Sequence, residues 1–294
     1  MIREDIEKIV EPIICECLRK FGDFSPPDTS VEGFAKATRG HLRPDVRRVS
    51  LLLSLAQLVA GPEFAGEGLE LGCGYGYLLF PFALYFPKIR WTGVEHPDRA
   101  YFNRPDFLQA FRDYHCKLVG TDFVHESLPF PDQHFSMATL SETLEHLPLE
   151  RLGFILSEIH RVMAPGGFLI TSSPNQASLE NRILLLRGKS ILNLPEYVAH
   201  ANGTFGHIRL YTPDEMILMM GKLGFTLERS ALESNNSAYR GSSSKSLRRR
   251  LYRLYETAEQ CFDFLRTFGD TWYMVFRKNT PMLSWKSART SSEK

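Results

Sequence analysis

Three glycines alternate with other residues directly after a short apolar run. Residues 69–76 read Leu-Glu-Leu-Gly-Cys-Gly-Tyr-Gly, which places glycines at positions 72, 74 and 76. Glycine adopts backbone conformations that other residues avoid and lets a ligand approach the main chain, so the pattern predicts a ligand-binding turn between a strand and a helix. Position 77 is Tyr, so the spacing does not satisfy the GxGxxG pattern of nicotinamide-dinucleotide sites. Glu70 has no role against a pyrophosphate, but it suits a ligand that carries a cationic amine.

A second acid stands at the end of the next predicted strand. Glu95 closes an apolar run over residues 90–95. At the carboxyl end of a strand in a nucleotide-binding sheet, an acid can accept hydrogen bonds from both hydroxyls of a ribose. Glu95 is therefore a candidate ligand-binding residue.

Short apolar runs alternate with helical patterns from residue 68 onward, which predicts how these residues are positioned. The predicted strands are 68–71, 90–95, 116–120, 135–140, 168–172, 224–229 and 271–276. The predicted helices are 2–20, 44–60, 77–86, 97–112, 149–163, 212–223 and 247–265. Strands that alternate with helices pair in parallel through right-handed crossovers. The expected fold is an α/β domain with a doubly wound, mostly parallel seven-stranded sheet, N-terminal helices and a helical insertion before the last strand.

Several motifs occur in the order typical of one enzyme family. The octet at 69–76 resembles motif I of the class I S-adenosylmethionine-dependent methyltransferases, in particular small-molecule and sugar methyltransferases similar to the ubiquinone-biosynthesis group. Residues 129–136 resemble the family's LPFPDNSFD run, with Ser136 in place of an Asp that is normally structural. Residues 141–147 resemble its EVLEHL element, and the Pro-Gly-Gly at 165–167 resembles the turn before the fifth strand. The resemblance covers about residues 65–229.

The resemblance implies S-adenosylmethionine as the cofactor. In this family the acid at Glu95 binds the ribose, the acid at Asp122 faces the adenine amino group, and Phe123 packs on the adenine ring. The expected cofactor-binding residues are Glu70, Gly72, Cys73, Gly74, Tyr75, Gly76, Glu95, His96, Asp122, Phe123 and Ser141.

Methyl transfer is an in-line displacement, so the protein must align the acceptor with the methyl group and remove one proton from a hydroxyl or ammonium nucleophile. His207, Glu142 and His146 are the candidate catalytic residues near the ends of the fourth and fifth strands. His207 precedes a helix whose start is indicated by Thr212-Pro213-Asp214-Glu215. Alternatively, Glu142 is only a polar wall of the pocket, and His146 caps a helix or shapes the pocket, as its counterpart in the family more often does.

Composition narrows the range of partners and compartments. The 294 residues include 35 basic and 34 acidic side chains, so no nucleic-acid partner is expected from net charge. The five cysteines form no CxxC pair, which predicts free thiols in a reducing compartment and no metal site. The N-terminus lacks the pattern of a signal peptide, and the longest apolar stretch is too short to span a bilayer. We therefore expect a cytoplasmic protein; the sequence carries no indication of its oligomeric state.

The expected domain organisation has four parts. A helical cap covers 1–60, the cofactor-binding core covers 61–230 with a substrate insertion at about 175–211, a basic helix and the final strand occupy 231–280, and 281–294 form a disordered tail. Acceptor specificity is expected in 30–50, 175–211 and 235–265. Arg39 to Arg43 could meet an anionic substrate, or could begin a solvated helix. The basic helix 247–265 could make peripheral contact with an anionic membrane, or could pack on the core with a solvated face.

The predicted function is methylation of a hydroxyl, or alternatively an amine, of a small molecule such as a sugar, glycolipid or natural product. Neither Asn-Pro-Pro-Tyr nor Asp-Pro-Pro-Tyr follows the fourth predicted strand. In methyltransferase families that have such a tetrapeptide it cradles a planar nitrogen, so its absence argues against amino groups of nucleobases or glutamine as acceptors. Two alternatives belong to other classes: a nicotinamide-dependent oxidoreductase, and a methyltransferase-like scaffold that binds the cofactor without catalysis.

Overall fold

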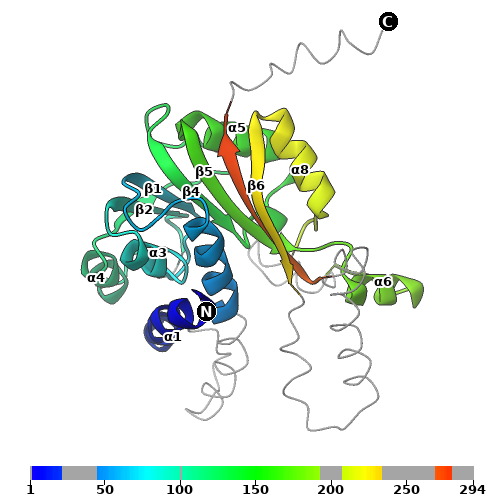
Figure 1. The fold of residues 1–294 in the computed structure, drawn as a ribbon, viewed down its shortest axis with the longest axis horizontal. Coiled ribbons are helices and arrows are strands. Elements are labelled where there is room, and N and C mark those ends of the chain that lie inside the picture. The colour runs from blue at the N-terminus through cyan, green and yellow to red at the C-terminus, as the bar shows by residue number, and fades with distance from the viewer. Residues whose placement is uncertain (1, 22–44, 100, 193–206, 234–268, 280–294) are drawn as a thin grey trace, which may run out of the picture.

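A seven-stranded sheet forms the centre of the computed structural model, which describes residues 2–21, 45–99, 101–192, 207–233 and 269–279 (Figure 1). Its strand order is β3-β2-β1-β4-β5-β7-β6. Strands β1 to β5 are mutually parallel, and β7 is antiparallel to both β5 and β6. The strands are β1 (Gly66–Leu71), β2 (Ile89–Glu95), β3 (Lys117–Gly120), β4 (Phe135–Ser141), β5 (Met163–Pro174), β6 (Phe225–Glu233) and β7 (Thr271–Lys278). This arrangement confirms the predicted doubly wound, mostly parallel sheet.

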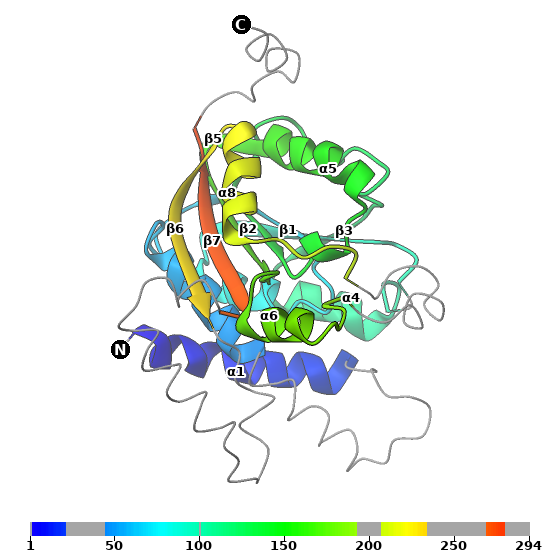
Figure 2. The ribbon, with the colours of Figure 1, turned by 90° about the vertical axis from the view of Figure 1, so that its right-hand side faces the viewer.

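Helices cover both faces of the sheet. They are α1 (Ile2–Phe21), a helix over residues 45–57, α3 (Leu79–Tyr85), α4 (Pro105–Asp113), α5 (Leu149–Val162), α6 (Leu179–Leu186), α8 (Pro213–Lys222) and the short 3-10 helix η1 (Leu144–His146). Figure 1 shows α1, α3 and α4 on one side of the sheet and α5 and α8 on the other. In the view of Figure 2, α1 runs below the sheet and α5 lies above it.

Side chains that alternate along each strand divide the core into two clusters. Met137 and Ile170 pack with α1, the helix 45–57 and α3, whereas their neighbours Ala138 and Leu169 pack with α5 and α8. Successive residues of a strand point to opposite faces, so both faces of the central strands must be apolar. The N-terminal helices thus share a core with the sheet whose edge carries the site.

Some predicted elements have different bounds in the structure. The predicted helix 97–112 was wrong in its first half, because α4 begins only at Pro105. Proline lacks an N–H and disfavours helical geometry at the preceding residue, so it suits the first helical turn. The expected irregular insertion after residue 174 contains α6, and β6 continues to Glu233 rather than ending at 229. The Pro-Gly-Gly run at 165–167 lies within β5, beside a register shift against β4.

The carboxyl ends of the five parallel strands meet along one edge of the sheet. The β5–β7 register pairs Ser172 with Tyr273, and the β6–β7 register pairs Glu233 with Thr271, so the start of β7 and the end of β6 reach this edge as well. Arg47, on the helix 45–57, forms an ion pair with Glu233 at 2.6 Å and ties that helix to the same edge. Among the described residues, no helix combines the length and apolar character needed to cross a membrane.

Candidate active site

The glycine turn after β1 has the unusual backbone that its sequence predicted. Gly72, Gly74 and Gly76 have φ values of +69°, +49° and +81°. A Cβ atom at Gly76 would lie 2.4 Å from the ring of Phe80, whereas one at Gly74 would meet no protein atom within 4 Å. Gly76 is therefore required by packing, and Gly74 faces open space where a ligand can approach the main chain.

Glu70 lies deeper than a surface ligand-binding acid. It is 4% exposed, and its Oε2 has no hydrogen-bond partner among the described residues. Burial raises the pKa of Glu70 well above its ordinary value, while Arg48 and the Leu79 backbone N–H act in the opposite direction. A cationic group placed close to this carboxyl would offset the desolvation of its charged form.

Glu95 joins the end of β2 to the glycine turn. Its Oε2 accepts a hydrogen bond from the Gly74 N–H at 2.8 Å, and its Oε1 accepts one from the His96 N–H at 2.9 Å. The side chain of Arg99 approaches the same carboxylate at 3.4 Å. Each carboxylate oxygen has two lone pairs; Oε1 already has two donors, whereas Oε2 accepts one hydrogen bond and keeps a lone pair for a further donor.

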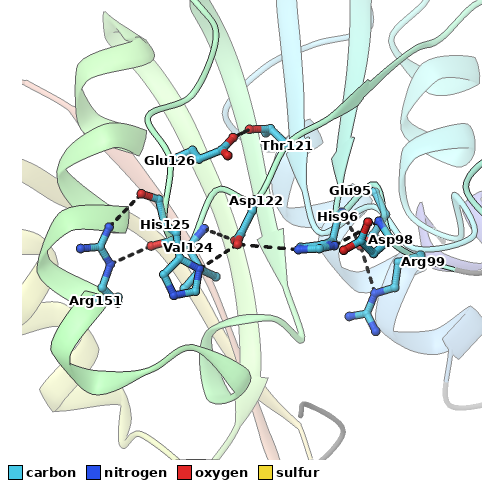
Figure 3. A network of polar contacts seen from close by, with 10 residues as sticks. All are labelled: Glu95, His96, Asp98, Arg99, Thr121, Asp122, Val124, His125, Glu126 and Arg151. Carbon is cyan, nitrogen blue, oxygen red and sulfur yellow. Dashed lines mark hydrogen bonds and ion pairs between the residues drawn. The ribbon is translucent and has the colours of Figure 1, made fainter. Parts of the chain in front are cut away.

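A polar bridge connects the ends of β2 and β3 (Figure 3). Asp122 lies between two imidazoles: its Oδ2 is 2.7 Å from His125 Nδ1 and 3.7 Å from His96 Nε2, and its Oδ1 accepts from the Val124 N–H. Burial acts to raise the pKa of Asp122, but these hydrogen bonds and charges hold it below its ordinary value. Asp122 is therefore an ionised acceptor at neutral pH. Arg151 fixes the loop by donating to the Val124 carbonyl at 2.8 Å.

The remaining residues predicted for the cofactor have varied environments. Cys73 is buried against Gly93, and burial raises the pKa of its thiol, so its role in the turn is packing. Tyr75 is half-buried and packs on Tyr101 with ring centroids 4.4 Å apart. Phe123 is buried in the core cluster beneath α5.

At the end of β4, hydroxyls and a carboxylate form a chain of hydrogen bonds. The Ser141 and Ser172 hydroxyls are 2.8 Å apart, and Ser172 donates to Glu142 Oε1 at 2.9 Å. Glu142 has φ of +51°, a conformation that L residues rarely adopt and that is concentrated at functional sites. Arg48 enters from the helix 45–57 and donates to Ser141 at 3.3 Å.

The third part of the site joins η1 to the segment that precedes α8. Glu145 is 1% exposed; Ser173 donates to its Oε2 at 3.0 Å, and its Oε1 has no partner among the described residues. Burial, followed by the nearby charge of Glu142, raises the pKa of Glu145 to about 8. His146 and His207 have ring centroids 5.0 Å apart, and burial together with His146 lowers the pKa of His207.

The structure thus brings together the three predicted catalytic residues, Glu142, His146 and His207, at the carboxyl end of β4. Sequence reasoning missed three neighbours: Glu145, and the hydroxyl pair Ser172 and Ser173 at the end of β5. The two serines were a usable signal, because consecutive hydroxyls interrupt an otherwise apolar strand. Arg48 was grouped with a possible acceptor-binding segment, but its contact with Ser141 joins residues 93 positions apart and has no local signature.

Several predictions fall on residues outside those described. These are the anion-binding stretch 39–43, the basic helix 247–265 and the tail 281–294. The sequence predicted no metal site. In the structure, however, Glu145, His146 and His207 offer ligand atoms that all lie within 4.8 Å of one another.

Solved structures with a similar fold include S-adenosylmethionine-dependent methyltransferases. One from Archaeoglobus fulgidus is 18% identical, with a TM-score of 0.50 and coverage of 78% of this chain and 93% of that one. A possible histamine N-methyltransferase from Thermotoga maritima is 16% identical, with a TM-score of 0.51 and coverage of 90% and 100%. A putative sarcosine dimethylglycine methyltransferase from Galdieria sulphuraria is 15% identical, with a TM-score of 0.51 and coverage of 81% and 88%.

Comparison of the sequence with known protein families identifies the family of this chain. No curated protein matches the chain significantly. The model of the methyltransferase domain family matches residues 40–230, which is more than half of the chain. The protein therefore belongs to this family and is an S-adenosylmethionine-dependent methyltransferase.

Proposed function

We propose that the protein methylates a hydroxyl, or alternatively an amine, of a small acceptor such as a sugar, a glycolipid or a natural product. The observation that carries this proposal is the cluster of Glu142, Glu145, His146 and His207 at the end of β4. These groups can accept or hold a proton, and they lie on the same sheet edge as the glycine turn. An acceptor bound here would be next to groups able to remove its proton.

The residues on the cofactor side fit the adenosyl cofactor. S-adenosylmethionine, when bound, supplies a methyl group on an electrophilic sulfonium. Gly74 would allow the cofactor to lie against the main chain. Glu95 would accept one ribose hydroxyl with the lone pair left on Oε2, and the second on Oε1 in place of the long contact with Arg99. Asp122 would accept from the adenine amino group. The amino-acid end would lie nearest Glu70, whose unpartnered oxygen is suited to a cationic amine.

On the acceptor side, the chain would orient the nucleophile and exclude water. Arg48 and Ser141 would form one wall, and His146 and His207 the other, while the buried Ser172 supports Ser141 and Glu142 from behind. Glu142 is held by Ser172 in a strained backbone conformation, which fixes the direction of its carboxylate. Preorganised polar groups of this kind lower the barrier without needing a covalent intermediate.

The absence of the Asn-Pro-Pro-Tyr and Asp-Pro-Pro-Tyr tetrapeptides argues only against the amino groups of nucleobases or glutamine, so a small-molecule amine stays the alternative to a hydroxyl. The titles of the similar structures name histamine in one case and sarcosine dimethylglycine in another, so the shared fold leaves the acceptor open. The family match gives no support to the nicotinamide alternative. A non-catalytic scaffold would bind the cofactor and methylate no acceptor.

Two measurements test the proposal. Calorimetry with S-adenosylhomocysteine should give one site per chain, and Glu142→Gln should bind it as the wild type does. A screen with methyl-labelled cofactor against a small-molecule extract should then yield a labelled product with the wild type and at least about tenfold less with Glu142→Gln. Cofactor binding without any labelled product from small molecules would contradict the proposed acceptor class.

A further inference from the structure

A mixed cluster of one carboxylate and two imidazoles lies at the end of β4. Glu145, His146 and His207 each offer one ligand atom, and these atoms all lie within 4.8 Å of one another. Two ligands of one ion can be at most about 4.2 Å apart, twice the usual bond length of about 2.1 Å. Small rotations of these side chains would therefore bring all three within bonding distance of a single ion.

The backbone holds the two halves of this cluster together. The Ile208 N–H donates to the Glu145 carbonyl at 2.7 Å, and the Arg209 N–H approaches the same oxygen at 3.3 Å. These bonds fasten the residues next to His207 onto η1, although the two segments are more than sixty positions apart in the sequence. Proximity of His207 to His146 is thus a consequence of main-chain geometry.

Glu145 provides the second, independent observation. Its carboxyl is 1% exposed, and Ser173 orients it by donating to Oε2, while Oε1 has no partner among the described residues. A buried carboxylate oxygen without a partner is costly, and coordination of a cation is one of the few ways to compensate it. By donating to Glu145 Oε2, the Ser173 hydroxyl would fix the orientation of this carboxylate, as hydrogen-bond partners of metal ligands commonly do.

We propose that Glu145, His146 and His207 bind a divalent transition-metal ion such as zinc or cobalt. Two imidazole nitrogens and one carboxylate favour such ions over magnesium, which prefers oxygen ligands. Three protein ligands leave coordination positions open, as in catalytic rather than structural sites. If the proposed function holds, an acceptor oxygen would take an open position and lose its proton more easily, which favours hydroxyl acceptors over amines.

The test measures metal binding directly, on the full-length protein and without cofactor or acceptor. After treatment with a chelator and its removal, Zn²⁺ is titrated by calorimetry, and Co²⁺ by its visible absorption, into the wild type and into Glu145→Gln, His146→Ala and His207→Ala. His134→Ala is the matched control, because His134 is exposed and precedes the start of β4, whereas the cluster lies beyond the end of that strand. We expect one tight site per wild-type chain, at least tenfold weaker binding in each cluster variant, and wild-type binding in the control.

S-adenosylhomocysteine binding, measured in parallel, shows whether each variant is folded and keeps the two proposals separable. Where His146→Ala or His207→Ala fails this control, asparagine replaces alanine at the same position, because it conserves the size of the side chain more closely. Wild-type metal affinity in the His146→Ala/His207→Ala double variant, or no tight site in the wild type, would overturn the metal proposal and leave the proposed cofactor site untouched. If the folded wild type does not bind S-adenosylhomocysteine, the proposed function is contradicted instead.

Discussion

The two ends of the site are built in different ways. At the cofactor end, the glycine turn follows β1, Glu95 ends β2 and Asp122 comes shortly after β3, and backbone N–H groups contact both carboxylates. At the acceptor end, the contacts are between side chains of distant segments, such as Arg48 with Ser141 and Ser173 with Glu145. The first end has a rigid main-chain frame, whereas the second depends on buried charges that must compensate one another.

Glycine substitutions should separate packing from ligand approach within the cofactor end. Gly76→Ala should lower the free energy of unfolding by about 2–4 kcal/mol, because its Cβ overlaps Phe80 and its φ is positive. Gly74→Ala should cost only about 1 kcal/mol, because its Cβ meets no protein atom. Urea unfolding of both variants measures the difference. Equal losses of stability would contradict the assignment of a packing role to Gly76 and a ligand-approach role to Gly74.

Removal of the charge on Glu95 should have the largest effect on cofactor affinity. Glu95→Gln weakens hydrogen bonds that an anionic acceptor makes strong, at about 1.5–3 kcal/mol each. We expect about 100-fold weaker binding of S-adenosylhomocysteine by calorimetry. Glu67→Gln is the control, because Glu67 pairs with the exposed Arg90 at the far end of β1. An unchanged affinity in Glu95→Gln would remove this residue from the cofactor site.

Substitution of Arg48 should mainly affect the acceptor end. Arg48→Met removes a cation that opposes the charges of Glu70, Glu142 and Glu145, so we expect kcat/KM to fall about 30-fold, or roughly 2 kcal/mol. Arg47→Met breaks only a partly exposed ion pair, worth roughly 0–1 kcal/mol. Steady-state kinetics with an acceptor from the screen compares the two. Similar losses in both variants would indicate that the helix 45–57 acts only by packing.

The smallest effect is expected at Asp122. Asp122→Asn keeps the size of the side chain but loses its charge, and we expect affinity for S-adenosylhomocysteine to fall about fivefold, or roughly 1 kcal/mol. The pKa of Asp122 is held below its ordinary value. The wild type should therefore bind S-adenosylhomocysteine more tightly than Asp122→Asn at neutral pH, and this difference should disappear only as the pH falls through the lowered pKa. Calorimetry at several pH values checks this. An advantage that disappears near neutral pH would contradict an ionised Asp122.

Much of the cofactor end could be predicted from the sequence, because its determinants are local. A strand that runs into alternating glycines requires positive φ angles, and an acid at a strand end must lie at the carboxyl edge of the sheet. The motif order likewise predicted the doubly wound sheet. The start of α4 was the main local error, since the helical pattern outweighed the clear boundary at Pro105.

Only the tertiary structure decided the acceptor end. Nothing near Glu145 in the sequence predicts that it is buried, or that Ser173 and the main chain next to His207 bind it. These contacts depend on how η1, β5 and the segment before α8 pack together, and packing brings together residues whose separation along the chain carries no pattern. The chain's periodicity determines its layers and its cofactor-binding turn, but the distances between acceptor-site groups exist only once those layers have packed.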